Sequence, residues 1–389
     1  MTELEKLDNQ YIANTYTRFP VDIACGKGSL IYDSEGKEYI DMGTGIAVNS
    51  FGISDDIWEK AVIEQLDKIQ HTSNLYYTQP CVELAQLLCE KTGMKKVFFG
   101  NSGAEANECA IKVARKYAAE KKGSEYSTIV TLENSFHGRT LTTLAATGQE
   151  HYHELFQPLT PGFVHTPAND VDSLEKTVKE NKVAGILIEC VQGEGGVVAL
   201  DEAFVKAVEA ICSKEDIIFM VDEVQTGNGR SGQLYAYMNF GVSPDVVSTA
   251  KGLGGGLPLG ACIFGERVQD VLGHGDHGST FGANPVCCAG AVSVVRRIDE
   301  KLLAEVREKS DYIFNALKGA PGVEAVTGMG LMIGIKTAKS AGDIVKKCME
   351  KGVLCLTAKD KVRLLPALNI PQNLLEKAVN IIKGEIADA

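Results

Sequence analysis

One lysine stands at the start of a glycine-rich stretch, Ser248 to Gly260, and is the first candidate for chemistry. Lys251 follows the apolar pair Val246 and Val247. Glycine carries no Cβ, so the backbone of such a loop can approach a bound group closely. A lysine held out of bulk water can be neutral and can attack a carbonyl to form a Schiff base. The same pattern also occurs in ordinary turns, so the rest of the chain has to decide between the two interpretations.

Two carboxylates end the apolar run 217–221, at the point where a buried strand should stop. They are Asp222 and Glu223. Burying Asp222 without a partner would cost free energy, so it must face a cation. A protonated ring nitrogen meets that need, and a salt bridge to a nearby lysine or arginine meets it equally.

Two other polar segments follow apolar runs. Asn-Ser-Gly-Ala-Glu-Ala-Asn at 101–107 opens a predicted helix whose first amides, at Gly103 and Ala104, suit an anion. Ser102 in this segment can also be a plain helix cap. In the segment 135–139, an aromatic ring that can stack on a flat ligand stands near an arginine that can grip a carboxylate with two hydrogen bonds.

Glycines flank two more candidates. Glu194 lies in Gln-Gly-Glu-Gly-Gly and is either a turn residue or a site residue. Ser279 and Thr280 lie between glycines, where their hydroxyls suit phosphate or simply form a turn.

Taken together, the segments predict a ligand with a phosphorylated flat ring, a basic ring nitrogen and an aldehyde. Pyridoxal phosphate has all of these groups. The chain has no P-loop motif, and its glycine loop is not followed by a clear helix as a dinucleotide site requires.

Apolar strands alternate with helices after Lys95, which predicts a parallel sheet covered by helices on both faces. Ligands of such sheets bind beyond the carboxyl ends of the strands, where the polar segments fall. A second, smaller α/β region is expected after Ala291. We therefore predict an N-terminal segment (1–60) that packs on the small domain, a large domain (61–290) and a small C-terminal domain (291–389).

The composition of the chain argues against several classes of protein. The net charge of −12 argues against nucleic-acid binding, and no apolar run reaches membrane length. The polar, acidic start fits neither a signal nor a transit peptide, and eleven scattered cysteines suit a reducing compartment. A cytoplasmic protein is expected. The histidine pairs at 151/153 and 274/277 lack further ligands at a familiar spacing, so no metal site is predicted.

The chain resembles the class III pyridoxal-phosphate aminotransferases of fold type I, and within them the acetylornithine aminotransferases. The resemblance covers nearly the whole length. Its core is Asp222-Glu223-x-Gln225-x-Gly227, with Lys251 and the glycine loop 251 − 222 = 29 residues later. It implies an α/β fold with a large, mostly parallel sheet domain and a smaller α/β domain. It also implies a homodimer with shared active sites.

The resemblance assigns roles toward the cofactor. Lys251 forms the Schiff base and moves the proton, and Asp222 keeps the ring nitrogen protonated. The other cofactor-binding residues are Gly103, Ala104, Phe136, Glu223, Gln225 and, from the neighbouring subunit, Thr280.

The resemblance also assigns the substrate residues. Arg139 holds the distal carboxylate in both half-reactions, and Arg363 binds the carboxylate next to the keto group of 2-oxoglutarate. Glu194 pairs with Arg363 when the amine donor is bound, because a buried unpaired charge is expensive. Ser279 and Tyr16 line the substrate pocket.

The implied reaction moves the δ-amino group of N-acetylornithine to 2-oxoglutarate, in arginine biosynthesis. Gly45 stands where ornithine aminotransferases carry a tyrosine, which leaves room for an acylated α-nitrogen. Succinylornithine, N-succinyl-diaminopimelate, ornithine or 4-aminobutyrate remain alternative donors. A racemase or decarboxylase on this fold would need no Arg363, and a binding protein would be colourless. The chain departs from many relatives at 52–56 and at Asn228, a position that is usually apolar.

Overall fold

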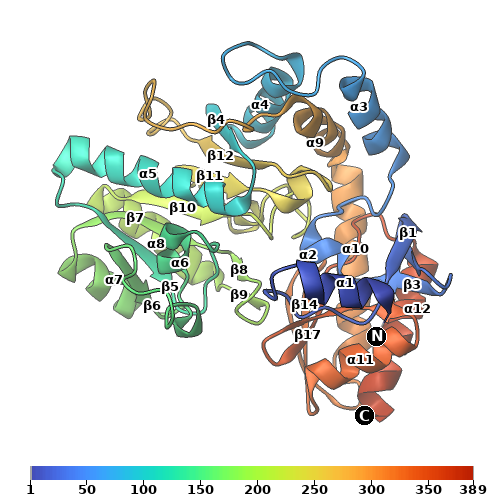
Figure 1. Cartoon of the computed structure of the whole chain (residues 1–389). Coiled ribbons are helices and arrows are strands. Elements are labelled where there is room, and N and C mark those ends of the chain that lie inside the picture. Colours follow the sequence, from blue (N-terminus) through green and yellow to red (C-terminus); the bar gives the residue numbers. More distant parts are fainter. Residues whose placement is uncertain (1, 389) are drawn as a thin grey trace.

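The computed structural model describes residues 2–388, and a seven-stranded sheet forms the centre of its larger part (Figure 1). Neighbouring strands pair in parallel from β11 to β6, whereas β12 runs antiparallel to both β11 and β4. The predicted mostly parallel sheet is confirmed. In sheet order the strands are β4 (Lys96–Gly100), β12 (Gly260–Phe264), β11 (Val246–Thr249), β10 (Ile218–Asp222), β7 (Val183–Ile188), β5 (Thr128–Leu132) and β6 (Phe163–Thr166).

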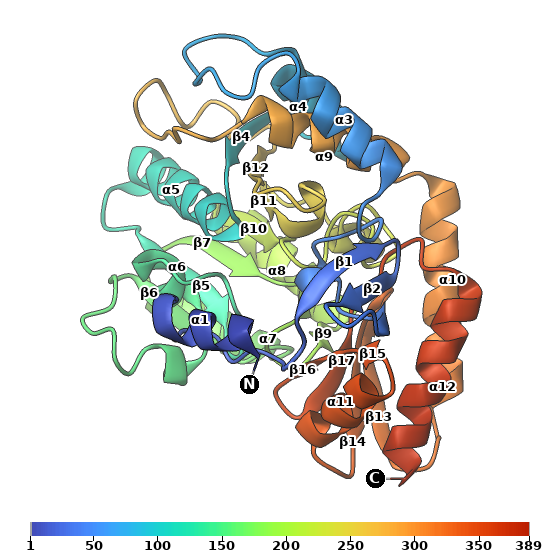
Figure 2. The ribbon, with the colours of Figure 1, turned by 45° about the vertical axis from the view of Figure 1, so that its right-hand side comes forward.

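Both faces of this sheet are buried, which explains why its strands are apolar along their whole length. On β10, Ile218 and Met220 pack in the core beneath α5, whereas Phe219 and Val221 pack in the core of the opposite face. Figure 2 shows α5 and α8 beside the sheet. The covering helices and the short elements among them are α5 (Gly103–Lys122), α6 (Leu141–Ala146), α7 (Val171–Glu180), α8 (Glu202–Glu215), η1 (Glu150–Tyr152), η2 (Ala236–Phe240), η3 (Lys251–Leu253), β8 (Val191–Gln192) and β9 (Val198–Ala199).

The C-terminal part forms a second, four-stranded sheet with its own helices. The strand order is β13-β14-β17-β16, and every pair is antiparallel. The helices α10 and α12 contact each other, and α11 contacts β17. The elements are α10 (Glu300–Leu317), β13 (Val323–Met329), β14 (Met332–Thr337), α11 (Ala341–Glu350), β16 (Leu356–Ala358), β17 (Lys361–Leu364) and α12 (Gln372–Asp388).

The N-terminal residues join this C-terminal part through a shared sheet of order β1-β2-β3-β15. β3 pairs in parallel with β15, so Ile40 lies opposite Val353 and Asp41 opposite Leu354. The two strands stand more than three hundred residues apart in the sequence. The strands of this sheet are β1 (Ile23–Lys27), β2 (Leu30–Asp33), β3 (Glu38–Asp41) and β15 (Val353–Leu354). The helix α1 (Glu3–Tyr11) precedes β1, and α2 (Thr44–Ala47) follows β3.

Three helices pack together at the β4 end of the large sheet, and two of them cross the predicted domain boundaries. They are α3 (Asp56–Leu66), α4 (Gln79–Thr92) and α9 (Pro285–Arg297). Because α9 contacts α3 and α4 along its length, we propose that the large domain runs from about residue 55 to 298 and that α10 begins the small domain. No helix among residues 2–388 is long and apolar enough to cross a membrane.

Close packing between β12 and the start of α5 depends on one glycine. A Cβ at Gly260 would collide with the backbone carbonyl oxygen of Ser102, directly before α5. Backbone cannot yield as a flexible side chain does, so any larger residue must push the start of α5 away from the sheet.

We predict that Gly260→Ala lowers the free energy of unfolding by about 1–3 kcal/mol, because it overpacks this contact. It should also weaken binding of the phosphorylated coenzyme that the sequence predicts, since it displaces the amides at the start of α5. Denaturant unfolding and a coenzyme titration measure the two effects. Gly384→Ala is the matched control, because a Cβ at Gly384, within α12, meets open space. Equal stability of the two variants would contradict the prediction.

Candidate active site

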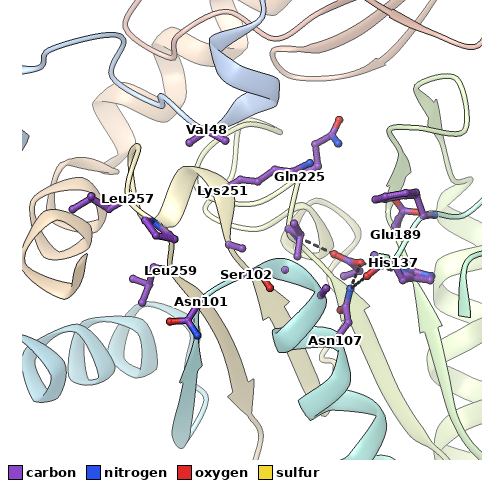
Figure 3. A pocket seen from close by; sticks show the side chains of 18 of the residues that line it. Val48, Asn101, Ser102, Asn107, His137, Glu189, Gln225, Lys251, Leu257 and Leu259 are labelled. Atoms are coloured by element: carbon purple, nitrogen blue, oxygen red, sulfur yellow. Dashed lines mark hydrogen bonds and ion pairs between the residues drawn. The ribbon is translucent and has the colours of Figure 1, made fainter. Parts of the chain in front are cut away.

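A cavity of about 410 Å³ opens at the carboxyl ends of the parallel strands (Figure 3). Its lining comes from the polar segments that follow β4, β5, β7, β10 and β11, as the expectation for such sheets requires. The lining residues used below are Asn101, Gly103, Ala104, Asn107, Phe136, His137, Glu189, Asp222, Val224, Gln225 and Lys251.

Lys251 lies two residues beyond the end of β11 and opens the short turn η3, where its side chain reaches the cavity. Burial lowers the pKa of its amine from 10.5 to about 8, while the nearby charge of Glu194 acts to raise it and that of Arg363 to lower it. A lysine with this pKa is partly neutral near pH 8, and the neutral amine is the nucleophile.

Asp222 ends β10 and is 4% exposed. Its Oδ2 accepts hydrogen bonds from Asn107 Nδ2 (2.7 Å) and from His137 Nδ1 (2.9 Å). Its Oδ1 accepts one from the backbone N–H of Val224 (3.0 Å). Figure 3 shows Asn107 and His137 on the same side of the cavity, with dashed lines marking their interactions. The protein therefore holds the carboxylate with an amide, an imidazole and a backbone N–H, and the alternative of a lysine or arginine partner does not apply.

Sequence reasoning missed both Asn107 and His137 as partners of Asp222. Asn107 lies one turn into α5, so it faces the same side as Gly103 at the start of that helix. His137 stands next to Phe136 in the segment that was singled out for its aromatic ring. Asn107 is fixed in turn, because Ser248 Oγ donates to its Oδ1 (2.5 Å). The spacing of Gly103 and Asn107 on one helix face was the available indication.

The N-terminus of α5 supplies backbone donors to the cavity. Ser102 is the N-cap, and its Oγ accepts from the N–H of Glu105 (3.2 Å), as the cap interpretation predicted. The first amides of a helix have no partner inside the helix, so those of Gly103 and Ala104 remain available for an anion. A Cβ at Gly103 would lie 2.6 Å from Val224 Cγ1, so the close approach of this helix end to the loop after β10 requires glycine.

Phe136 lines the cavity and is tied to Glu189, the residue that follows β7. The backbone N–H of Phe136 donates to Glu189 Oε2 (2.9 Å). Burial, and after it the charge of Asp222, raises the pKa of Glu189 well above its ordinary value. Arg139 does not line the cavity. It is exposed, with its guanidinium carbon 5.7 Å from the ring centres of both Phe136 and Tyr152.

Glu194 and Arg363 form an ion pair between the large and the small part of the molecule. Glu194 Oε1 lies 2.6 Å from Arg363 Nη1, and Gln225 hydrogen-bonds to both side chains at 3.3 Å. Arg363 is 4% exposed, and its Nε has no partner among the described residues. Burial acts to raise the pKa of Glu194, but the charge and hydrogen bond of Arg363, the charge of Lys251 and the hydrogen bond of Gln225 together lower it below its ordinary value. The pairing expected from the resemblance is therefore present in this structure.

Glu223 does not reach the cavity, contrary to its place among the expected cofactor ligands. Its carboxylate accepts from Thr226 Oγ1 (2.6 Å) and from the backbone N–H of Tyr237 (2.9 Å), so it braces the loop that follows β10. Because successive residues of a strand point to opposite faces, only Asp222 of the two carboxylates can face the ligand. Burial raises the pKa of Glu223 to about 7.

Three other expected site residues also lie outside the cavity of this chain. Tyr16 is 64% exposed and lies in a separate groove, with the guanidinium of Arg18 over its ring. Ser279 Oγ accepts from Asn101 Nδ2 (3.0 Å), so it lies beside the lining, and Thr280 is exposed at the surface. No group of three or more metal-ligating side chains is present among the described residues.

The model of one protein family, described as aminotransferase class-III, matches residues 11–386. The chain belongs to the class-III aminotransferases. Among curated members, it is 48% identical to an acetylornithine aminotransferase of Haemophilus ducreyi over 388 residues, which is 99% of each chain. It is 42% identical to one of Methanocaldococcus jannaschii, over 97% of this chain and 96% of the other.

Solved class-III aminotransferases have the same fold. An ornithine aminotransferase of Toxoplasma gondii, described as having partial occupancy of PLP at its active site, superposes with a TM-score of 0.95 at 31% identity. The match covers 100% of this chain and 95% of that one. An N-acetylornithine aminotransferase of Stenotrophomonas maltophilia gives a TM-score of 0.85 at 32% identity, with 98% of both chains covered. These neighbours establish fold type I for this class-III aminotransferase.

Class-III aminotransferases use pyridoxal phosphate, and the cavity has groups that fit it. The free amides at the start of α5 suit the phosphate, and Lys251 suits the aldehyde. The Asp222 carboxylate is buried, and its three donors are an amide, an imidazole and a backbone N–H, with no lysine or arginine among them. A protonated ring nitrogen would therefore supply the cationic partner that this carboxylate needs.

We predict that Glu189→Gln makes the stability of the coenzyme-free chain less dependent on pH. Because the pKa of Glu189 is higher in the folded than in the unfolded state, its contribution is present below pH 4.5 and is lost as the pH rises. Glutamine mimics the protonated acid and does not titrate. Denaturant unfolding from about pH 5 to about pH 8 should show a smaller loss of stability than in the wild type. Glu150→Gln, at an exposed position, is the control, and equal pH slopes for Glu189→Gln and the wild type would refute the prediction.

Proposed function

We propose that this protein transfers the δ-amino group of N-acetylornithine to 2-oxoglutarate, which yields N-acetylglutamate 5-semialdehyde and glutamate. The observation that carries the proposal is the placement of the Lys251 amine and the Asp222 carboxylate in one cavity at the strand ends. The choice of donor is supported by full-length relatives named acetylornithine aminotransferase at 40–48% identity.

Bound pyridoxal phosphate supplies an electron sink for the pair of electrons left when a proton leaves the substrate carbon. In our proposal, the Lys251 amine would hold the coenzyme at its aldehyde and would act as general base and acid toward the substrate carbon. The Asp222 carboxylate would keep the ring nitrogen protonated. Asn107 and His137 keep its carboxylate in place.

The remaining cofactor contacts follow from the lining of the cavity. The backbone amides of Gly103 and Ala104 would bind the phosphate, the ring of Phe136 would stack on the coenzyme ring, and Gln225 would bind the ring hydroxyl. Gln225 already hydrogen-bonds Glu194 and Arg363, so it links the cofactor side of the site to the substrate side.

The Glu194–Arg363 pair is proposed as the switch between the two substrates. The amine donor has no carboxylate next to its reacting carbon, so it offers no partner to Arg363. While the donor is bound, Glu194 neutralises this buried guanidinium. When 2-oxoglutarate enters, its 1-carboxylate replaces Glu194, which swings away. Removal of either partner alone would leave a buried charge unpaired, which is strongly unfavourable, so exchange of one carboxylate for another is the low-cost route.

The distal end of both substrates is proposed to bind Arg139. The rings of Phe136 and Tyr152 hold this guanidinium, and no described acid pairs with it, so it is free to accept a carboxylate. Gly45 has φ 62°, and a Cβ there would come no nearer than 3.8 Å to Asn49 Nδ2 and Val48 Cβ, which supports the proposal that the missing side chain leaves room for an acylated nitrogen.

A homodimer with shared active sites is proposed to complete the pocket. Thr280 and Tyr16 are exposed in the single chain, and so is a set of apolar side chains on α3, on the loop after it, on α4 and near Thr280. Many large apolar side chains exposed on neighbouring elements are typical of an interaction surface. Its members are Ile57, Ile63, Leu66, Ile69, Leu75, Tyr76, Tyr77, Val82 and Phe281. The eleven free cysteines support a reducing, cytoplasmic location.

The decisive test replaces the proposed nucleophile. We expect Lys251→Ala to lose the visible absorbance of covalently bound coenzyme and to lower turnover of N-acetylornithine at least about a hundredfold, because the nucleophile and proton carrier is gone. Spectra after removal of free pyridoxal phosphate, and a coupled glutamate assay, measure both effects.

Lys361→Ala is the matched control for this test. Burial also lowers the pKa of Lys361, but its amine donates to Thr327 outside the cavity. If Lys251→Ala kept the absorbance, or if Lys361→Ala lost it, the assignment would fail. In the same assay, succinylornithine, N-succinyl-diaminopimelate, ornithine and 4-aminobutyrate should each give a lower kcat/KM than N-acetylornithine.

A second prediction concerns the switch. Glu194→Gln removes the charge that masks Arg363, so kcat/KM should shift toward glutamate and away from N-acetylornithine. We expect the ratio of the two values to change by about tenfold, or about 1.4 kcal/mol. Initial rates with each donor measure it, and Glu180→Gln, on the exposed end of α7, is the control. An unchanged ratio would argue against masking.

A further inference from the structure

The backbone that carries Lys251 has a conformation that residues other than glycine rarely adopt. Lys251 has φ 45°, and Ala250 before it has φ −162° and ψ −142°. Such strain persists only where the surrounding structure holds it, and it clusters at functional sites. The turn η3 is only three residues long, so its own hydrogen bonds cannot supply all of this support.

Side chains from outside the turn donate hydrogen bonds to alternate carbonyl oxygens along it. Two of them come from the N-terminal part of the chain, and the third comes from the loop that follows β10. The bonds are Ser50 Oγ to Gly252 (3.4 Å), Trp58 Nε1 to Gly254 (3.0 Å) and Asn228 Nδ2 to Ala250 (3.2 Å).

Asn228 makes the contact closest to the reactive lysine. Besides Ala250, its Nδ2 also donates to Thr249 Oγ1 (3.0 Å), the last residue of β11. One amide group therefore ties the end of the strand to the first residue beyond it. Asn228 is 2% exposed, and a Cβ at Gly252 would lie 3.2 Å from Asn228 Cβ, so the side chain packs directly against the turn.

The orientation of this amide reveals which of its two ends matters. The carbonyl oxygen of Ala250 can only accept, so Nδ2 must face it. Asn228 Oδ1 is then left buried with no hydrogen-bond partner among the described residues. A buried acceptor without a partner costs free energy, and a leucine of similar size would avoid that cost. At this position, which is usually apolar in relatives, the donor end of Asn228 therefore gives this chain a specific contact with the carbonyl oxygen of Ala250.

We propose that Asn228 is a positioning residue that fixes the Ala250–Lys251 peptide and so holds the lysine amine in the cavity. This inference rests on the proposed role of Lys251 as the coenzyme-binding amine. Asn228 touches neither the coenzyme nor the substrate, since it does not line the cavity. It acts indirectly, by fixing the backbone from which the Lys251 side chain extends.

The proposal predicts a change in the titration of Lys251. Held in the cavity, the amine has its pKa lowered to about 8 by burial. Without the hydrogen bond to Ala250, the turn can relax and the amine can reach more water, so its pKa rises toward the ordinary value of 10.5. A purely structural role for Asn228 would lower stability without moving this titration.

The test compares Asn228→Leu and Asn228→Gly with the wild type. Leucine removes the donor at similar volume, whereas glycine removes it and still tolerates the φ of 57° found at this position. The rate at which pyridoxal phosphate adds to the coenzyme-free protein, measured against pH, reports the lysine titration. We expect its midpoint to rise in both variants and kcat to fall by about ten- to a hundredfold, with the KM values for both substrates little changed.

Asn239→Leu is the matched control, because Asn239 also donates to a backbone carbonyl, that of Ala236, which is not part of the lysine turn. Circular dichroism establishes that each variant is folded, and Asn228→Gly answers the question if Asn228→Leu does not fold. Unchanged midpoint and kcat in a folded Asn228 variant would overturn the inference alone. A wild-type protein whose Lys251 does not react with pyridoxal phosphate would overturn the proposed function, and the inference with it.

Discussion

The site depends on one negative charge placed where the central strand of the sheet ends. Asp222 is almost fully buried, and an uncompensated carboxylate there would be very costly. Its three donors come from α5, from the loop after β5 and from its own turn, so the charge fixes the positions of three segments relative to one another. The segments that bring Asn107 and His137 to it also bring the free amides of α5 and the ring of Phe136.

Much of this arrangement was predictable, because parallel strands present the residues at their carboxyl ends to one place. Lys251, Asp222 and Phe136 each follow an apolar run, and the structure brings them to one cavity. The direction of a side chain was less predictable. Glu223 neighbours Asp222 in sequence, yet it points to the other face and braces Tyr237.

Three other features could not be predicted from the sequence: the strand β6, the direction of β12 and the partners of Asp222. The strand β6 is a short edge strand with His165 and Thr166 in it, so it did not stand out as an apolar run. The reversed direction of β12 follows from its place between β11 and β4, which composition does not encode. The hydrogen bond between Asn107 and Asp222 spans 115 residues, and only the fold reveals it.

The parallel pairing of β3 with β15 has a consequence for how the protein is made. A ribosome releases β3 early, but its partner strand emerges only after almost the whole polypeptide has been synthesised. Until then the β3 edge lacks its hydrogen-bonding neighbour, and closing so long a loop is entropically slow. Ser50 and Trp58, which donate hydrogen bonds to the lysine turn, follow β3 in the chain. Two supports of the lysine turn therefore lie shortly after a strand whose pairing needs one of the last segments to be synthesised.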